Sequence, residues 1–248
     1  MDLIAGFSTL QIAVAVAATL GAAFIRGLTG FGFGILLVPI LALALTPVQA
    51  VLAINIMAGL LAFSELRLIL RHAERRSALT ICAMVLLATP LGLMLLDATP
   101  RGLARLLIAL VALSAFFAVL LPRRGADQPG HLTTGLTGLV AGLLTGFAAM
   151  PGPPVVPYYV GRDIPRVTAK ASMVAVFGVA ALTGVASGAA LGVLEWRIVA
   201  LSVGLFPLVL LGNWVGSHAF GKGNDKLWRL FVGVVLAAAA VAALVKLV

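Results

Sequence analysis

The chain has 248 residues, of which 62% are hydrophobic and only 10% are charged, and its mean hydropathy is +1.18. This composition excludes an ordinary soluble protein and predicts an all-α, polytopic membrane protein, because no polar stretch is long enough to fold alone. The formal net charge is +9. The basic residues gather between apolar runs instead of forming a stripe, which indicates cytoplasmic loops and argues against nucleic-acid binding.

Eight apolar runs are close to the roughly 20 residues that a membrane crossing needs. They predict full-length helices at 4–25, 48–70, 77–96, 102–121, 132–149, 167–191, 197–218 and 227–246. The residues before the first run include Asp2 and no basic residue, so we expect a retained membrane segment and not a cleaved signal peptide. Two shorter helices, at 32–45 and 152–161, each follow a break rich in glycine or proline. These two either cross the membrane as short tilted helices or re-enter it.

The two halves of the chain resemble each other in sequence. Leu28-Thr29-Gly30-Phe31 recurs as Leu144-Thr145-Gly146-Phe147, and further weak matches follow in the same order. Because internal similarity at a fixed spacing indicates duplication, we interpret the chain as a first repeat at 1–124, a linker at 125–131 and a second repeat at 132–248. The linker lies in the most polar stretch of the chain, 122–131.

The distribution of charge decides between two orientations of these repeats. If both short segments cross, each half has five membrane segments and the second half is inverted; if neither crosses, the halves are parallel. The inverted arrangement places the basic loops 71–76, 122–131, 162–170 and 222–226 together on one side, with 97–101 and 192–196 on the other. The parallel arrangement leaves the basic loop 162–170 outside. The positive-inside rule therefore favours inverted repeats with both termini outside the cytoplasm.

Each half contains a stretch in which a continuous helix is unfavourable. The first, 27–39, has four glycines and Pro39, and the second has four prolines between 151 and 157. An interior glycine costs about 1 kcal/mol relative to alanine, and proline lacks the amide hydrogen. Backbone groups freed at membrane depth must face protein or a watery cavity. Two half-helix N-termini that meet at the midplane would bind an anion; the alternative is that these small residues only allow close helix packing.

The motifs around both breaks resemble those of a known family. Gly27-Leu-Thr-Gly-Phe-Gly-Phe-Gly with Pro39, and Gly146-Phe-Ala-Ala-Met-Pro-Gly-Pro-Pro-Val-Val, are similar to the paired motifs of the sulfite exporter (TauE/SafE) family of membrane transporters, and the resemblance spans nearly the whole chain. It implies a duplicated, multi-pass secondary carrier of sulfite, sulfonates or related small organic anions, expected to act as an exporter in the cell inner (plasma) membrane. Phe33 stands where many members have glycine, so the identity of the anion stays open.

The candidate substrate-binding residues lie in or near the breaks, because polar groups inside a membrane are costly and mark pathways. They are Thr29, Gly30, Phe31, Gly32, Phe33, Gly34, Asn55, Thr145, Met150, Pro151, Gly152, Pro153 and Lys170.

Each polar candidate has a structural alternative. The Asn55 amide can donate to an oxyanion or join two helices, and the two threonines can bond their own backbone instead. Lys170 can face the cavity mouth or serve as an ordinary positive-inside anchor. Arg26 precedes the first break and can either attract anions or extend to the cytoplasmic interface, of which we expect the second. Glu65 is expected to be structural, with a partner on another helix because residues two apart on one helix do not face each other.

Other functions have weaker support. An intramembrane enzyme would need a nucleophile with a base or clustered metal ligands, but His72, His131 and His218 are far apart, and Cys82 is the single cysteine. Gly30 to Gly34 lacks the lysine and the strand of a phosphate loop. We therefore expect no enzyme activity, no cofactor and no metal, with a small anion and membrane lipid as partners. A non-transporting subunit of a complex is the alternative, and the oligomeric state is open, a homodimer included.

Overall fold

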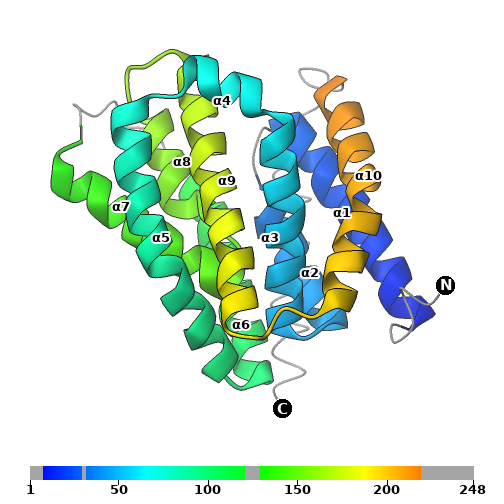
Figure 1. The fold of residues 1–248 in the computed structure, drawn as a ribbon. Coiled ribbons are helices and arrows are strands. Elements are labelled where there is room, and N and C mark those ends of the chain that lie inside the picture. The colour runs from blue at the N-terminus through cyan, green and yellow to red at the C-terminus, as the bar shows by residue number, and fades with distance from the viewer. Residues whose placement is uncertain (1–7, 30–31, 121–128, 219–248) are drawn as a thin grey trace.

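The computed structural model describes residues 8–29, 32–120 and 129–218, in which the chain forms ten helices and no strand (Figure 1). The predicted all-α fold is thus confirmed. In chain order the helices are α1 Thr9–Thr29, α2 Phe33–Ala44, α3 Pro47–Ser64, α4 Leu66–His72, α5 Arg75–Ala98, α6 Arg101–Leu120, α7 His131–Ala148, α8 Gly152–Val160, α9 Arg166–Ala190 and α10 Trp196–His218.

Six helices of the described ranges are long and apolar enough to span a membrane, namely α1, α3, α5, α7, α9 and α10. The expected helix at 102–121 is α6, and the expected segment at 227–246 lies outside the described residues. The expected helix at 48–70 is wrong in one respect, since it is divided at Glu65 into α3 and the short α4. At Glu65 the backbone has φ −102° and ψ 11°, outside the helical values, so the run 66–72 leaves the line of α3 and packs against α9 with none of its residues buried.

Both predicted breaks are present, and each contains a residue with positive φ. Gly32 (φ 93°) precedes α2, and Ala149 (φ 50°) follows α7. A left-handed conformation suits glycine but costs a side chain about 1–2 kcal/mol. The Ala149 conformation is stabilised by the capping of α7, because its N–H donates to the Thr145 carbonyl at 2.8 Å and the next N–H donates to the Leu144 carbonyl at 3.2 Å.

The helices pack in pairs that join distant parts of the chain. α1 lies along α10, α5 lies along α7, and α3 packs against α9 near the centre (Figure 1). At the first two seams the backbones touch: a Cβ atom on Gly216 would lie 2.0 Å from the Phe24 carbonyl oxygen, and one on Gly146 would lie 2.1 Å from that of Thr89. Close packing through small residues is common between membrane helices, and here it occurs mainly along these seams.

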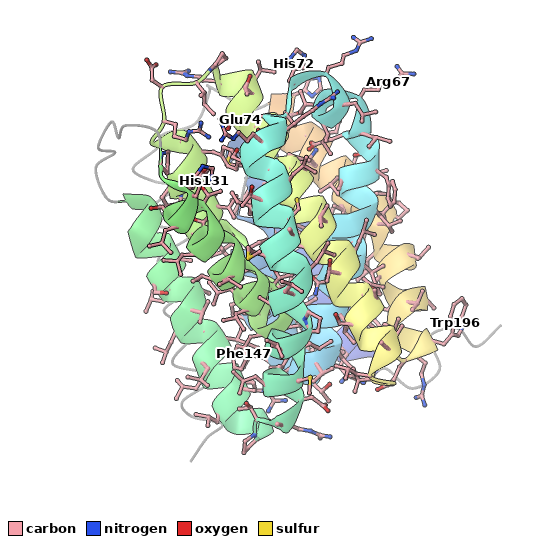
Figure 2. All side chains as sticks on the ribbon, turned by 60° about the vertical axis from the view of Figure 1, so that its left-hand side comes forward. Arg67, His72, Glu74, His131, Phe147 and Trp196 are labelled. Atoms are coloured by element: carbon pink, nitrogen blue, oxygen red, sulfur yellow. The ribbon has the colours of Figure 1, made fainter. Side chains whose placement is uncertain are left out.

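Polar side chains gather at two opposite ends of the helices (Figure 2). We call one the Glu74 end, comprising residues 65–76, 131–134 and 158–170, where Arg162 pairs with Glu74. The other is the Glu195 end, comprising residues 8–11, 44–49, 97–105 and 191–197, where the Gln49 amide donates to Glu195 at 2.9 Å. At this second end the Arg105 guanidinium donates to the Ala42 carbonyl at 2.6 Å and so satisfies the C-terminal end of α2.

Candidate functional site

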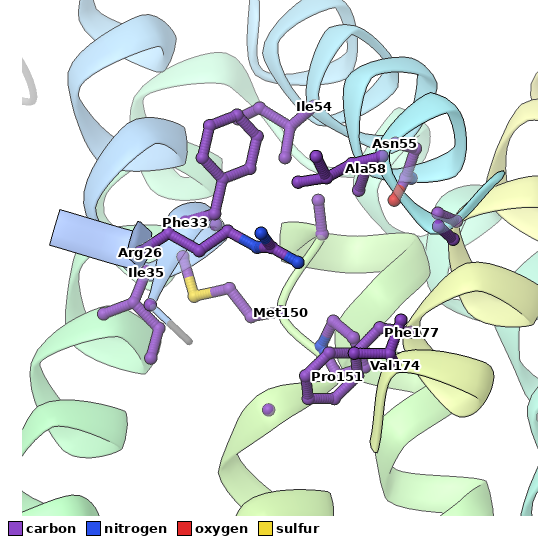
Figure 3. A pocket seen from close by; sticks show the side chains of 17 residues that line it. Arg26, Phe33, Ile35, Ile54, Asn55, Ala58, Met150, Pro151, Val174 and Phe177 are labelled. Carbon is purple, nitrogen blue, oxygen red and sulfur yellow. The ribbon is translucent and has the colours of Figure 1, made fainter. Parts of the chain in front are cut away.

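A cavity of about 80 Å³ lies where the two helix breaks meet (Figure 3). A single water needs roughly 10–15 Å³ of such space, so several waters or one small solute would fit. The lining comes from Arg26 at the end of α1, from both breaks, from the middle of α3 and from α9. Both breaks therefore contribute to the wall of one cavity, as the sequence predicted.

Seven of the predicted site residues line this cavity. They are Gly32, Phe33 and Gly34 of the first break, Asn55 of α3, and Met150, Pro151 and Gly152 of the second break.

Three of the other predicted residues, Thr145, Pro153 and Lys170, are not brought into the lining. Thr145 is fully buried and its hydroxyl donates to the Ala141 carbonyl at 2.7 Å, which is the structural alternative for a membrane threonine. Pro153 is half-buried and absent from the lining, and Lys170 is exposed on the first turn of α9. Gly30, Phe31 and the Thr29 side chain lie outside the described residues.

Backbone donors reach the cavity from the start of α2. The N–H groups of the first helical turn, Phe33 to Ile35, have no helical acceptor, and they carry the partial positive charge of the helix N-terminus. Gly34 brings this turn against the other break, since a Cβ atom there would lie 2.5 Å from the Ala149 carbonyl oxygen. A glycine is required for that contact.

The second break does not provide an equivalent set of donors. The first turn of α8 is Gly152-Pro153-Pro154, preceded by Pro151, and proline has no amide hydrogen. Gly152 is therefore the one residue of this turn that offers an N–H. The two helix ends are not the symmetrical pair of amide donors that the sequence led us to expect, because the prolines that end α7 also remove the donors.

The Asn55 side chain is a buried donor without a partner. It is 2% exposed, it lines the cavity, and among the described residues its Nδ2 finds no hydrogen-bond acceptor. Gly184 on α9 makes room for it, because a Cβ atom there would lie 2.4 Å from Nδ2. A buried polar atom left unpaired costs about 1–3 kcal/mol. Among the described residues, Asn55 therefore does not join two helices through an Nδ2 hydrogen bond.

Arg26 lines the cavity, although the sequence favoured a position at the interface. Its Nη1 donates to Asn213 Oδ1 at 2.9 Å and its Nη2 lies 3.4 Å from Glu65 Oε2, with side chains of Arg26 and Glu65 only 13% and 18% exposed. Arg26 does not extend to the interface as expected; it makes these two contacts instead. The expected partner of Glu65 on another helix is confirmed.

Two signals in the sequence point to this cluster. Arg26 directly precedes the first break, and Asn213 lies between two glycines, Gly212 and Gly216, that bring α10 into backbone contact with α1. The glycine spacing explains why a polar residue of α10 can reach Arg26.

The remaining wall is mostly apolar. Figure 3 shows the Arg26 guanidinium extending into the cavity among Phe33, Met150, Val174 and Phe177. One guanidinium, one unpaired amide and one helix N-terminus thus present hydrogen-bond donors inside a largely apolar pocket. Such a set of donors in an apolar, small cavity suits an anion with oxygen acceptors.

Comparison with known proteins agrees with this geometry. The model of the family described as "Sulfite exporter TauE/SafE" matches residues 15–243, which include both breaks and nearly the whole chain. No curated protein and no solved structure matches the chain. With its membrane-spanning helices and this near-complete match, the protein belongs to the TauE/SafE sulfite exporter family of membrane transporters.

Proposed function

We propose that the protein is a secondary carrier of a small sulfur oxyanion or sulfonate, which binds in the cavity between the two breaks. The observation that carries this proposal is the unpaired amide of Asn55, buried at 2% exposure in that cavity. Family membership supports a transporter and, through the printed name, sulfite as the first candidate. Most buried polar side chains in proteins are hydrogen-bonded, so an unpaired amide on a residue that lines free space supports a bound solute there.

The helix pairing supports inverted repeats and alternating access around this cavity. When each helix of one repeat is replaced by its counterpart in the other, the pair α1–α10 becomes the pair α7–α5, and the central pair α3–α9 maps onto itself. The glycine contacts follow the same exchange: Gly27 touches the Asn213 backbone of α10, and Gly146 touches the Thr89 backbone of α5. We therefore match Gly27 with Gly146. The short sequence motifs instead match Gly30 with Gly146, about one helical turn further along the chain. Two similar halves around one site can rock to open it on either side.

The cavity supports an inward-facing state in the proposed topology. Its lining extends along α3 to Leu61 and Ala62, toward the Glu74 end. In the opposite direction Leu37, Leu41 and Leu52 are fully buried and close the path. The Glu74 end carries most of the basic residues of the described loops, so we place it in the cytoplasm. For a solute that leaves an inside-negative cell, the potential supplies roughly 2.3 kcal/mol per negative charge per 100 mV.

The topology has its own test. In a Cys82→Ala background, a cysteine at the exposed position Asp163 should react with a membrane-impermeant reagent from the cytoplasmic side, and one at the exposed position Ala98 from the outside. Labelling of both from one side would contradict the inverted arrangement.

Transport is tested by counterflow in proteoliposomes that contain the purified protein. The panel is sulfite, thiosulfate, methanesulfonate and acetate, and the variants are Asn55→Ala and the control Thr80→Ala, whose exposed hydroxyl bonds its own helix. We expect exchange of a sulfur oxyanion, with affinity reduced about ten-fold or more in Asn55→Ala, since a hydrogen bond to a charged group contributes about 1.5–3 kcal/mol. A protein that exchanges no anion would point to a non-transporting subunit. Unchanged kinetics in Asn55→Ala would remove Asn55 from the site.

A further inference from the structure

Three helices bring a polar cluster to the rim of the cavity at the Glu74 end. Arg26 comes from α1, Glu65 from the junction of α3 and α4, and Asn213 from α10. Of the three, Arg26 lines the cavity. The guanidinium thus faces a carboxylate on one side and the proposed binding space on the other.

We propose that Glu65 is the resident counter-ion of Arg26 and that the transported anion replaces Glu65 as the partner of the guanidinium. This inference rests on the proposed function, and it assigns the charge that selects an anion over a neutral solute. In the empty state the carboxylate balances the buried guanidinium. In the loaded state the oxyanion does so, with the Asn55 amide as a further donor.

The contact between Arg26 and Glu65 is loose enough for such an exchange. A single pair of atoms, Nη2 and Oε2, approaches to 3.4 Å, whereas charge-assisted bonds of this kind are typically about 2.7–2.9 Å long and often bidentate. The chain itself supplies the contrast at Arg162, which holds Glu74 through both carboxylate oxygens, with Nη2 to Oε1 at 2.8 Å. Arg26 therefore has donors to spare, because a guanidinium offers five N–H groups.

Glu65 also sits where its displacement disturbs little packing. It is the C-cap of α3, with φ −102° and ψ 11°, and it directly precedes α4, none of whose residues is buried. Asn213 holds Arg26 independently, since Nη1 donates to its Oδ1 at 2.9 Å. Loss of the Glu65 contact therefore leaves the guanidinium in place and facing the cavity.

Competition between Glu65 and the anion for the Arg26 guanidinium has a measurable consequence. An anion must displace Glu65 before it pairs with Arg26, so removing the carboxylate charge should tighten anion binding instead of weakening it. A purely structural ion pair predicts the opposite sign or no change. The guanidinium fork matches two oxygens of one solute, which fits a sulfonate, sulfite or carboxylate group.

The test measures binding of methanesulfonate to the purified full-length protein in detergent by titration calorimetry, with dimethyl sulfone as the uncharged analogue of similar shape. We expect Glu65→Gln to bind methanesulfonate about ten-fold more tightly, within the 5- to 150-fold span of typical coupling between sites, and Arg26→Gln to bind it at least ten-fold more weakly. In the double variant Arg26→Gln/Glu65→Gln the gain from Glu65→Gln should vanish. Dimethyl sulfone should bind no tighter in any variant.

The outcomes separate this inference from the proposed function. A wild-type protein that binds none of the panel anions contradicts the proposed function itself. A wild-type protein that binds methanesulfonate, with Glu65→Gln weaker or unchanged, overturns the exchange of partners. If Arg26→Gln does not fold, Arg26→Lys replaces it: the charge stays, so Glu65→Gln should still tighten binding in that background, and a lack of tightening counts against the proposal.

Discussion

Gly34→Ala is the substitution that most directly probes the contact between the two breaks. The added Cβ would lie 2.5 Å from the Ala149 carbonyl oxygen, and real Cβ atoms essentially never approach below 3.0 Å. The start of α2 and the end of α7 must therefore separate by about 0.5–0.9 Å to reach an ordinary tight contact at 3.0–3.4 Å. Overpacking of this kind typically costs about 1–3 kcal/mol. Alanine recovers about 0.5–1 kcal/mol of that by stiffening the unfolded chain and favouring helix, which leaves a net destabilisation of about 0.5–2 kcal/mol.

The matched control is Gly152→Ala, at the start of the other half-helix. Its Cβ would meet nothing closer than Val156 Cγ2 at 3.9 Å, so we expect stability equal to the wild type or slightly higher. Thermal unfolding of the purified proteins in detergent compares the two. A Gly34→Ala protein that melts with the wild type, or a Gly152→Ala protein that is equally destabilised, would refute the contact between the breaks.

Three further substitutions test the packing and charges away from the cavity, each by thermal unfolding in detergent. The hydrogen bond from Arg162 holds the pKa of Glu74 below its usual value of 4.5. This interaction therefore stabilises the folded protein above pH 4.5, and the stabilisation is lost as the pH falls through the lower pKa of the folded state. Glu74→Gln should be less stable than the wild type at pH 7 and equal to it at the acidic limit. Gly146→Ala, with a Cβ 2.1 Å from the backbone of α5, should lose about 1–3 kcal/mol, whereas Gly135→Ala, with no atom within 4 Å, should lose nothing; equal losses would argue against the glycine seam. Arg105→Leu should lose about 1.5–3 kcal/mol because two carbonyls at the end of α2, at 2.6 and 3.4 Å, lose a charged donor, and an unchanged melting temperature would show that water caps that end equally well.

The breaks and the amide of Asn55 were predictable because they depend on local chemistry. Glycines and prolines interrupt a helix wherever they occur, and a lone amide in an apolar run is conspicuous. The division at Glu65 was not predicted, because the run 66–72 is apolar enough to continue α3. Arg26 was expected at the interface because an arginine near a membrane surface ordinarily extends to water, whereas the partners that hold it inward come from α10 and from the end of α3.

The sequence by itself determined that this is an all-helical membrane protein, where its two glycine- and proline-rich breaks lie, and which family it resembles. These features follow from composition, helix propensity and the cost of free backbone groups in lipid. The tertiary structure alone decided which polar groups share the cavity and that Arg26 stands between Glu65 and the binding space. Those relations depend on how closely distant helices approach, which is set by the glycines at their contacts and is not encoded by any single segment.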